Sequence, residues 1–263
     1  MKRLTSRKKR LVALVSILTL SLAAVAVAEA AQSGNVVVHF HGSISPRKLP
    51  RQGLAPVGVQ MGGKINTKDG TQPPRLTEIQ LEINKHGVID PAGLPTCALG
   101  KLHNASPARA KRVCGPAEVG HGNVTTRIHL REQGEFATPG SMLAFNGRYK
   151  GKPAIFAHVT SNGRLALTYV IVFQIEKAKG SYGTALVAKI PSIASGAGFI
   201  SAFDLLLKRR FTAGGKQHSY ISAACPLPSG IFIGPFKFAR STYIFEDGTE
   251  VSEDLEKTCK ARG

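Results

Sequence analysis

The sequence predicts an all-β protein, a large antiparallel β-sandwich with one short helix and two disulfide bonds. Three observations lead to this prediction. Polar and apolar residues alternate along most of the chain after residue 34, turn sequences separate the alternating segments, and four cysteines follow a segment with the features of an export signal.

Alternation with a period of two residues is typical of strands that bury one face. Residues 122–132 show it well, because Val124 and Ile128 share one face while Arg127 lies on the other. The same pattern, or a short apolar run between turn residues, predicts the remaining strands. The expected strands are 35–44, 56–65, 76–84, 122–132, 141–148, 153–160, 166–177, 183–190, 198–209, 217–223, 236–246 and 249–257.

Turn residues lie between several of these segments. Asp247-Gly248 separates the last two strands, and Asp-Gly readily takes the positive φ angles of a tight hairpin. We expect turns of the same kind at residues 213–216, which contain two glycines, and at 149–152, which contain Gly151. We therefore expect consecutive antiparallel pairs.

One segment has the start and stop residues of a helix. Ser106 is a good N-cap, Pro107 suits the first helical position, and Gly115 is expected to end the helix in the left-handed conformation. A helix of barely two turns is not stable alone in water, so a covalent tether from its last residue would help it.

The N-terminus has the pattern of a secretory signal peptide. Six cations lie within residues 2–10, an uncharged, mainly apolar run extends from Leu11 to Ala28, and small residues end it. We assign residues 1–30 to the signal; the alternative is an uncleaved membrane anchor at 11–28. Under either reading the rest of the chain is expected outside the cytoplasm, secreted or associated with the cell envelope.

Residues 31–263 are expected to form a single β-sandwich domain. The segment 91–121 holds the first two cysteines, the helix and several Gly and Pro residues, and it interrupts the strands. The part before it offers about three strands, too few for an independent sheet. We therefore interpret 91–121 as an excursion tethered by a disulfide.

The four cysteines allow three pairings. Short loop closure and the hairpin near the C-terminus favour Cys97 with Cys114 and Cys225 with Cys259. A structural zinc site would need closely spaced cysteine pairs, and the sequence has none.

The charge favours an anionic partner. Without residues 1–30 the chain loses six of its 35 basic and one of its 16 acidic residues, which leaves a net charge of about +14. Basic residues gather at 47–51, 109–112, 148–152 and 208–210. The candidate anion-binding residues are Arg47, Lys48, Arg51, Lys208, Arg209 and Arg210.

Anionic cell-wall or envelope polymers are the expected partners of these residues, and the alternative is an ordinary solvated surface. Nucleic acid is not expected, because the chain has the features of an exported protein and carries no recognisable nucleic-acid motif. Membrane contact is expected only through residues 11–28, if they are retained.

No catalytic residue, metal site or cofactor is assigned from the sequence. Ser45-Pro46-Arg47-Lys48 matches S-x-x-K in letters, but Pro46 argues against the helix that this motif needs. His39 and His41 would share one face of a strand, yet a third ligand is not marked. The absence of Trp disfavours a carbohydrate platform.

Several segments together resemble a group of uncharacterised secreted proteins of high-GC Gram-positive bacteria. The segments are 42–50, 93–97, 143–148, 223–226 and 247–259. The resemblance covers most of the chain after the signal and implies export, β structure and the cysteine framework. It implies no activity, so no functional residue is carried over.

Two functions from different classes follow. The first is an exported, non-enzymatic cell-surface or extracellular protein that binds anionic envelope polymers weakly. The second is a secreted hydrolase or carbohydrate-active enzyme with a site assembled from scattered residues. A pocket in which carboxylates or histidines converge would favour the second, and a filled interior would favour the first.

Overall fold

The computed structural model describes residues 30–132 and 134–262. The expected signal segment at 1–30 lies almost wholly outside this range. The strands are β1 (Ala31–Ser33), β2 (Val36–Ser45), β3 (Lys48–Leu49), β4 (Ala55–Pro56), β5 (Gly58–Thr67), β6 (Leu76–Asn84), β7 (Gly87–Ile89), β8 (Glu118–Leu130), β9 (Gly134–Tyr149), β10 (Lys152–Asn162), β11 (Ala166–Lys177), β12 (Tyr182–Lys189), β13 (Gly198–Leu207), β14 (Arg210–Ala213), β15 (Lys216–Ser219), β16 (Ile221–Ala223), β17 (Ile233–Phe245) and β18 (Glu250–Ala261).

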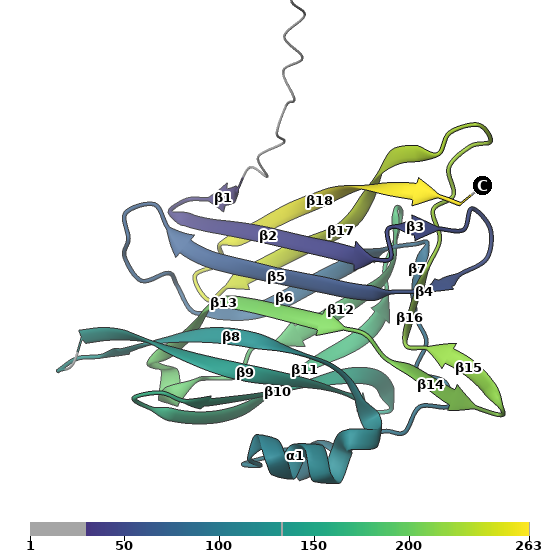
Figure 1. Ribbon diagram of the computed structural model, residues 1–263. Coiled ribbons are helices and arrows are strands. Elements are labelled where there is room, and N and C mark those ends of the chain that lie inside the picture. The colour runs from purple at the N-terminus through teal and green to yellow at the C-terminus, as the bar shows by residue number, and fades with distance from the viewer. Residues whose placement is uncertain (1–29, 133, 263) are drawn as a thin grey trace, which may run out of the picture.

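The protein is all-β, as predicted, and Figure 1 shows its strands facing one another in layers above and below a common interior. Most strands belong to one curled sheet, in the order β1-β2-β5-β13-β8-β9-β10-β11-β12-β6-β17-β18-β3. All of its named neighbours are antiparallel except β18 and β3. A single apolar interior receives side chains from β5, β6 and β8 to β13, so these strands curve around one core.

The two ends of the curled sheet approach each other where β18 lies beside β2. The backbone N–H of Phe40 in β2 donates a 2.7 Å hydrogen bond to a carboxylate oxygen of Glu253 in β18. Glu253 points inward and is buried, and this burial raises the pKa of its carboxyl group. A side chain thus joins strands that no backbone ladder connects.

The segment between β7 and β8 covers part of the outer face of the sheet. It contains α1 (Pro107–Cys114) and the 3-10 helices η1 (Leu99–Lys101) and η2 (Gly115–Ala117), while a third, η3 (Ala194–Gly196), precedes β13. Apolar residues of this segment, including Leu102 and Ala110, pack on Phe145 and Phe156 of β9 and β10 in a second core. Both faces of these strands are therefore buried, which explains why their sequences are apolar without alternation.

The tether of α1 is the predicted disulfide between Cys97 and Cys114, and the second disulfide joins Cys225 to Cys259. Ser106 caps the helix by accepting a hydrogen bond from the N–H of Arg109, also as predicted. The expected left-handed stop at Gly115 is wrong. Its φ is −52° because the chain continues into η2, where Pro116 fits the first turn.

The predicted hairpins at 149–152, 213–216 and 247–248 all form, as β9–β10, β14–β15 and β17–β18. The predicted strand 217–223 is divided at Tyr220 into β15 and β16, which join different small sheets. Among residues 30–132 and 134–262, no helix is long and apolar enough to span a bilayer.

Candidate anion-binding surface

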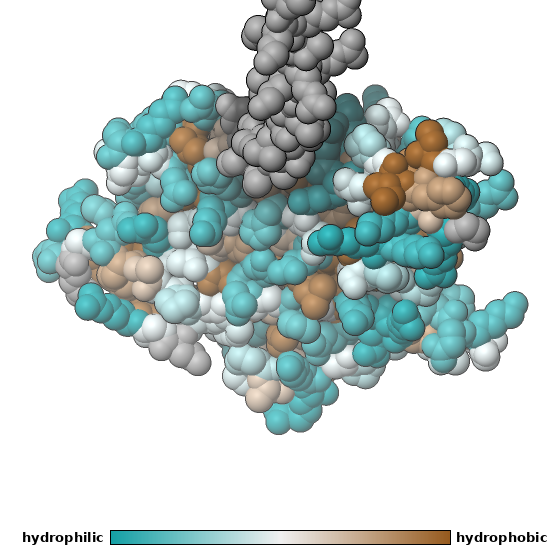
Figure 2. Space-filling model, turned by 45° about the horizontal axis from the view of Figure 1, so that its top comes forward, coloured by the Kyte–Doolittle hydropathy of each residue, from teal (hydrophilic) through white to brown (hydrophobic). Residues whose placement is uncertain are grey.

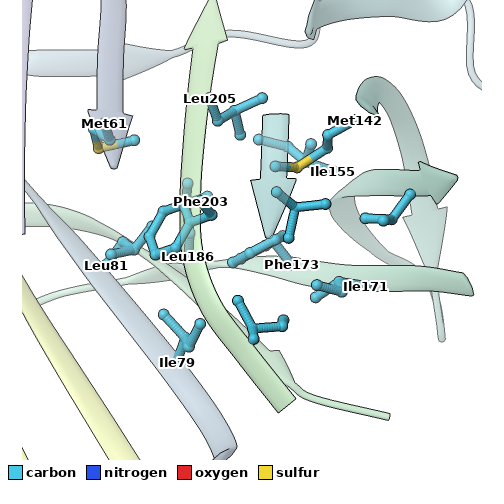
Figure 3. A pocket seen from close by; sticks show the side chains of 13 residues that line it. Met61, Ile79, Leu81, Met142, Ile155, Ile171, Phe173, Leu186, Phe203 and Leu205 are labelled. Carbon is cyan, nitrogen blue, oxygen red and sulfur yellow. The ribbon is translucent and has the colours of Figure 1, made fainter. Parts of the chain in front are cut away.

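The interior leaves little room for a ligand. It is lined by apolar side chains alone, among them Met61, Phe173 and Phe203, and Figure 3 shows these pointing toward one another. The space between them is about 30 Å³, far smaller than the roughly 300–1,000 Å³ of pockets that hold small molecules. Among the described residues, no carboxylate or histidine lines this cavity.

A polar pair lies on the outer face of β2, β5 and β13. Nε2 of His41 is 3.1 Å from a carboxylate oxygen of Asp204, and the side chain of Gln60 donates a 2.8 Å hydrogen bond to the other oxygen. The pair borders an open depression of about 220 Å³. His41 and Asp204 are 53% and 36% exposed, so water screens the pair.

This arrangement supplies an oriented imidazole but not a complete catalytic or metal site. Within residues 30–132 and 134–262, His41 forms no hydrogen bond to a hydroxyl or thiol group that could act as a nucleophile. His39 lies on the same face, as predicted. No group of three His, Cys, Asp or Glu residues in that part of the chain could hold a metal ion.

The predicted basic residues at 47–48 and 208–210 follow strands that end at the same end of the curled sheet. Ser45 at the end of β2 pairs with Gly58 of β5, and Leu207 at the end of β13 pairs with the next residue, Val59. The segments that begin at Arg47 and Lys208 therefore leave the sheet at the same end. The shared position of these two segments is not evident from the sequence, because 160 residues separate them. In the structure β5 pairs with both β2 and β13.

The C-terminal strand adds two cations that sequence reasoning missed. Lys260 of β18 pairs with Lys48 of β3, and the N–H of Arg262 donates a 2.7 Å hydrogen bond to the carbonyl of Leu49. The signal that could have located them is Cys259, because its predicted bond to Cys225 fixes the end of β18 near residue 225. We call Arg47, Lys48, Lys208, Arg209, Arg210, Lys260 and Arg262 the basic end.

Arg51, the remaining predicted anion-binding residue, has a different role. Its guanidinium donates hydrogen bonds of 2.7 and 2.6 Å to the carbonyls of Leu227 and Pro228, and it lies 5.1 Å from the ring centroid of Phe232. Arg51 therefore positions the loop between β16 and β17, and its hydrogen-bonding capacity is partly used within the protein.

The basic end carries unneutralised charge. The ion pairs formed within the described part of the chain involve none of its residues. The Nε of Arg209 is buried and has no hydrogen-bond partner there. Asp90 lies nearby. Its N–H donates to the carbonyl of Tyr220, and the N–H of Tyr220 donates to the carbonyl of Arg209. The Asp90 carboxylate accepts a hydrogen bond from the N–H of Ala92.

The other basic groups differ from the basic end. Near the β9–β10 turn, Arg148 bonds the carbonyl of Gly151 and Lys152 forms an ion pair with Glu176. Arg109, Lys111 and Arg112 lie on exposed positions of α1, on the far side of the molecule from β18 and β3 (Figure 1). The local pairing at 148–152 is what an ordinary solvated surface shows.

No protein-family model, curated protein or solved structure matches this chain.

Proposed function

We propose that this is an exported, non-enzymatic protein that adheres to anionic polymers of the cell envelope through its basic end. The observation that carries the proposal is that seven cations from three separate chain segments lie at one end of the sheet and form no ion pair within the described residues. Like charges held together repel one another, and an anionic polymer would relieve that repulsion. Two disulfides are compatible with an extracellular location.

Exposed charges in water attract weakly and are screened by salt, with a Debye length of about 8 Å at physiological ionic strength. The proposed adhesion is therefore reversible and salt-sensitive. It needs no pocket, which agrees with the filled interior.

Sedimentation with isolated cell envelope from the producing organism, at low and high salt, tests the proposal. A variant with Lys48→Gln, Arg210→Gln and Lys260→Gln should lose most of the retention seen at low salt. The matched control carries Lys101→Gln, Lys111→Gln and Arg112→Gln, which remove the same charge from exposed positions on the α1 side.

Equal loss in both variants would show that net charge alone matters, and no retention of the wild-type protein at low salt would end the proposal. Retention that persists at high salt would also contradict it, because screening should release a purely electrostatic contact.

The second candidate, a secreted hydrolase, is favoured by one observation, the hydrogen-bonded pair of His41 and Asp204 beside an open depression. Turnover of ester or glycoside substrates that is lost in His41→Gln and retained in His39→Gln would favour the enzyme. Activity that is absent, or insensitive to His41→Gln, would remove it.

A further inference from the structure

Three consecutive large hydrophobic residues are exposed to water where the loop between β16 and β17 passes into β17. Ile231, Phe232 and Ile233 are 47%, 55% and 57% exposed, although most large apolar side chains of the described chain are buried. We call these three residues the apolar tip. Figure 2 shows hydrophobic side chains gathered at the upper right among hydrophilic ones, at the end of the molecule where Figure 1 places this loop.

The apolar tip is held in place. Gly230, with a φ of +83°, permits a turn that the N–H of Ile231 closes on the carbonyl of Pro228. The carbonyl of Phe232 accepts a 2.8 Å hydrogen bond from the N–H of Ala261. Together with Arg51 and the Cys225–Cys259 disulfide, these contacts hold the loop in place while the three side chains stay about half exposed.

Cations flank the apolar tip. Lys260 pairs with Ile233 across the β17–β18 ladder and with Lys48 on its other side. Arg262 follows Ala261, the residue that bonds Phe232. Apolar side chains at a projecting point with basic residues around them match the chemistry of an anionic lipid surface, where hydrocarbon lies directly beneath phosphate groups.

A cleft of about 250 Å³ opens on the same loop. Pro226 and Leu227 form one wall, and Lys85, His86 and Lys237 contribute basic groups. Asp254 lies near Lys237, but it is bonded by Arg240 and Tyr182.

We propose that the apolar tip docks the protein onto anionic phospholipid bilayers, with Phe232 and its two neighbours entering the interface and the basic end contacting lipid phosphates. This rests on the proposed function, because the same basic end supplies the attraction. A protein partner is less well matched, since a stable protein interface buries about 800 Å² on each side and the tip offers three side chains. Membrane contact would then not depend on residues 11–28.

The absence of tryptophan from the chain allows a direct test. Phe232→Trp places a single tryptophan in the apolar tip and keeps an aromatic ring over Arg51. The matched control, Val113→Trp, places it on α1 at a position that is 37% exposed. Both full-length variants are mixed with phosphatidylglycerol vesicles, with phosphatidylcholine vesicles, and with soluble polyphosphate.

We expect a blue-shifted emission for Phe232→Trp with phosphatidylglycerol only, quenched by brominated acyl chains, and no shift for Val113→Trp. Binding of the double variant Phe232→Ser, Ile233→Ser to these vesicles should be about 50-fold weaker, because two half-exposed side chains no longer enter the interface. These substitutions are at exposed positions, and an unchanged circular dichroism spectrum would show that the fold is retained.

The failure of this inference is separable from failure of the proposed function. Salt-sensitive binding of both tryptophan variants without a blue shift would overturn insertion and leave electrostatic adhesion intact. A shift with polyphosphate would overturn the lipid as partner. Loss of all binding, to vesicles and to isolated envelope alike, would overturn both proposals.

Discussion

Removing the disulfide beneath the apolar tip should cost more stability than removing the one that tethers α1. The proposed perturbation is Cys225→Ala with Cys259→Ala, compared with Cys97→Ala and Cys114→Ala. All four cysteines are buried, so alanine avoids placing a hydroxyl in either core. Cys225 and Cys259 are 34 residues apart, and Cys97 and Cys114 are 17 apart. The chain-entropy model then gives losses of about 4 and about 3 kcal/mol respectively.

The assay is equilibrium unfolding in urea, followed by far-UV circular dichroism. Because the Cys97–Cys114 bond ties down a second core outside the curled sheet, its removal should also loosen residues 91–121 in hydrogen exchange while the sheet stays protected. Losses below about 1 kcal/mol for both pairs would contradict this prediction, as would hydrogen exchange that rises first in the sheet.

Three further predictions concern single residues. Glu253→Gln should keep an acceptor for the N–H of Phe40 and raise the free energy of unfolding at pH 7. Because burial raises the pKa of Glu253, the stabilising contribution of this residue is present in acid and is lost as pH rises through the folded-state pKa. Urea titrations across pH should show that this pH dependence of stability disappears in the variant. Gly147→Ala should destabilise by about 1–3 kcal/mol, because its Cβ would overlap the ring of Phe156; thermal unfolding that is unchanged would contradict this. His158 is buried and hydrogen-bonds the carbonyl of Ala105, and burial lowers the pKa of its imidazole. Acidification below the unfolded-state pKa of this histidine should therefore increase hydrogen exchange in the α1 segment. His158→Gln should abolish this increase.

Much of the strand content was predictable because its causes are local. The alternation in residues 122–132 and the Asp247-Gly248 turn depend on neighbours along the chain, and both formed as expected. The Gly115 stop was not predictable, because the chain's path after α1 depends on Pro116 and on packing against β9. Local glycine preference was overridden by tertiary context.

The sheet order and the candidate surface were less accessible. Successive strands were expected to pair, but β13 lies between β5 and β8, and β6 lies between β12 and β17. No residue pattern within β13 specifies that its neighbours are β5 and β8. The basic end depends on this insertion, because it brings Lys208 beside the segment that follows β2. The exposure of Ile231 to Ile233 was equally hidden, since an apolar run ordinarily predicts burial.

A lysine-acetylation footprint can show whether the basic end is where the protein meets the anionic envelope. The protein is acetylated free and while bound to isolated envelope at low salt, and each lysine is quantified by mass spectrometry. Lys48, Lys208 and Lys260 should be protected on binding, whereas Lys111 of α1, on the far side of the molecule from β18 and β3, should react equally in both states. Uniform protection, or protection strongest at Lys111, would show that the protein does not meet the envelope through the basic end.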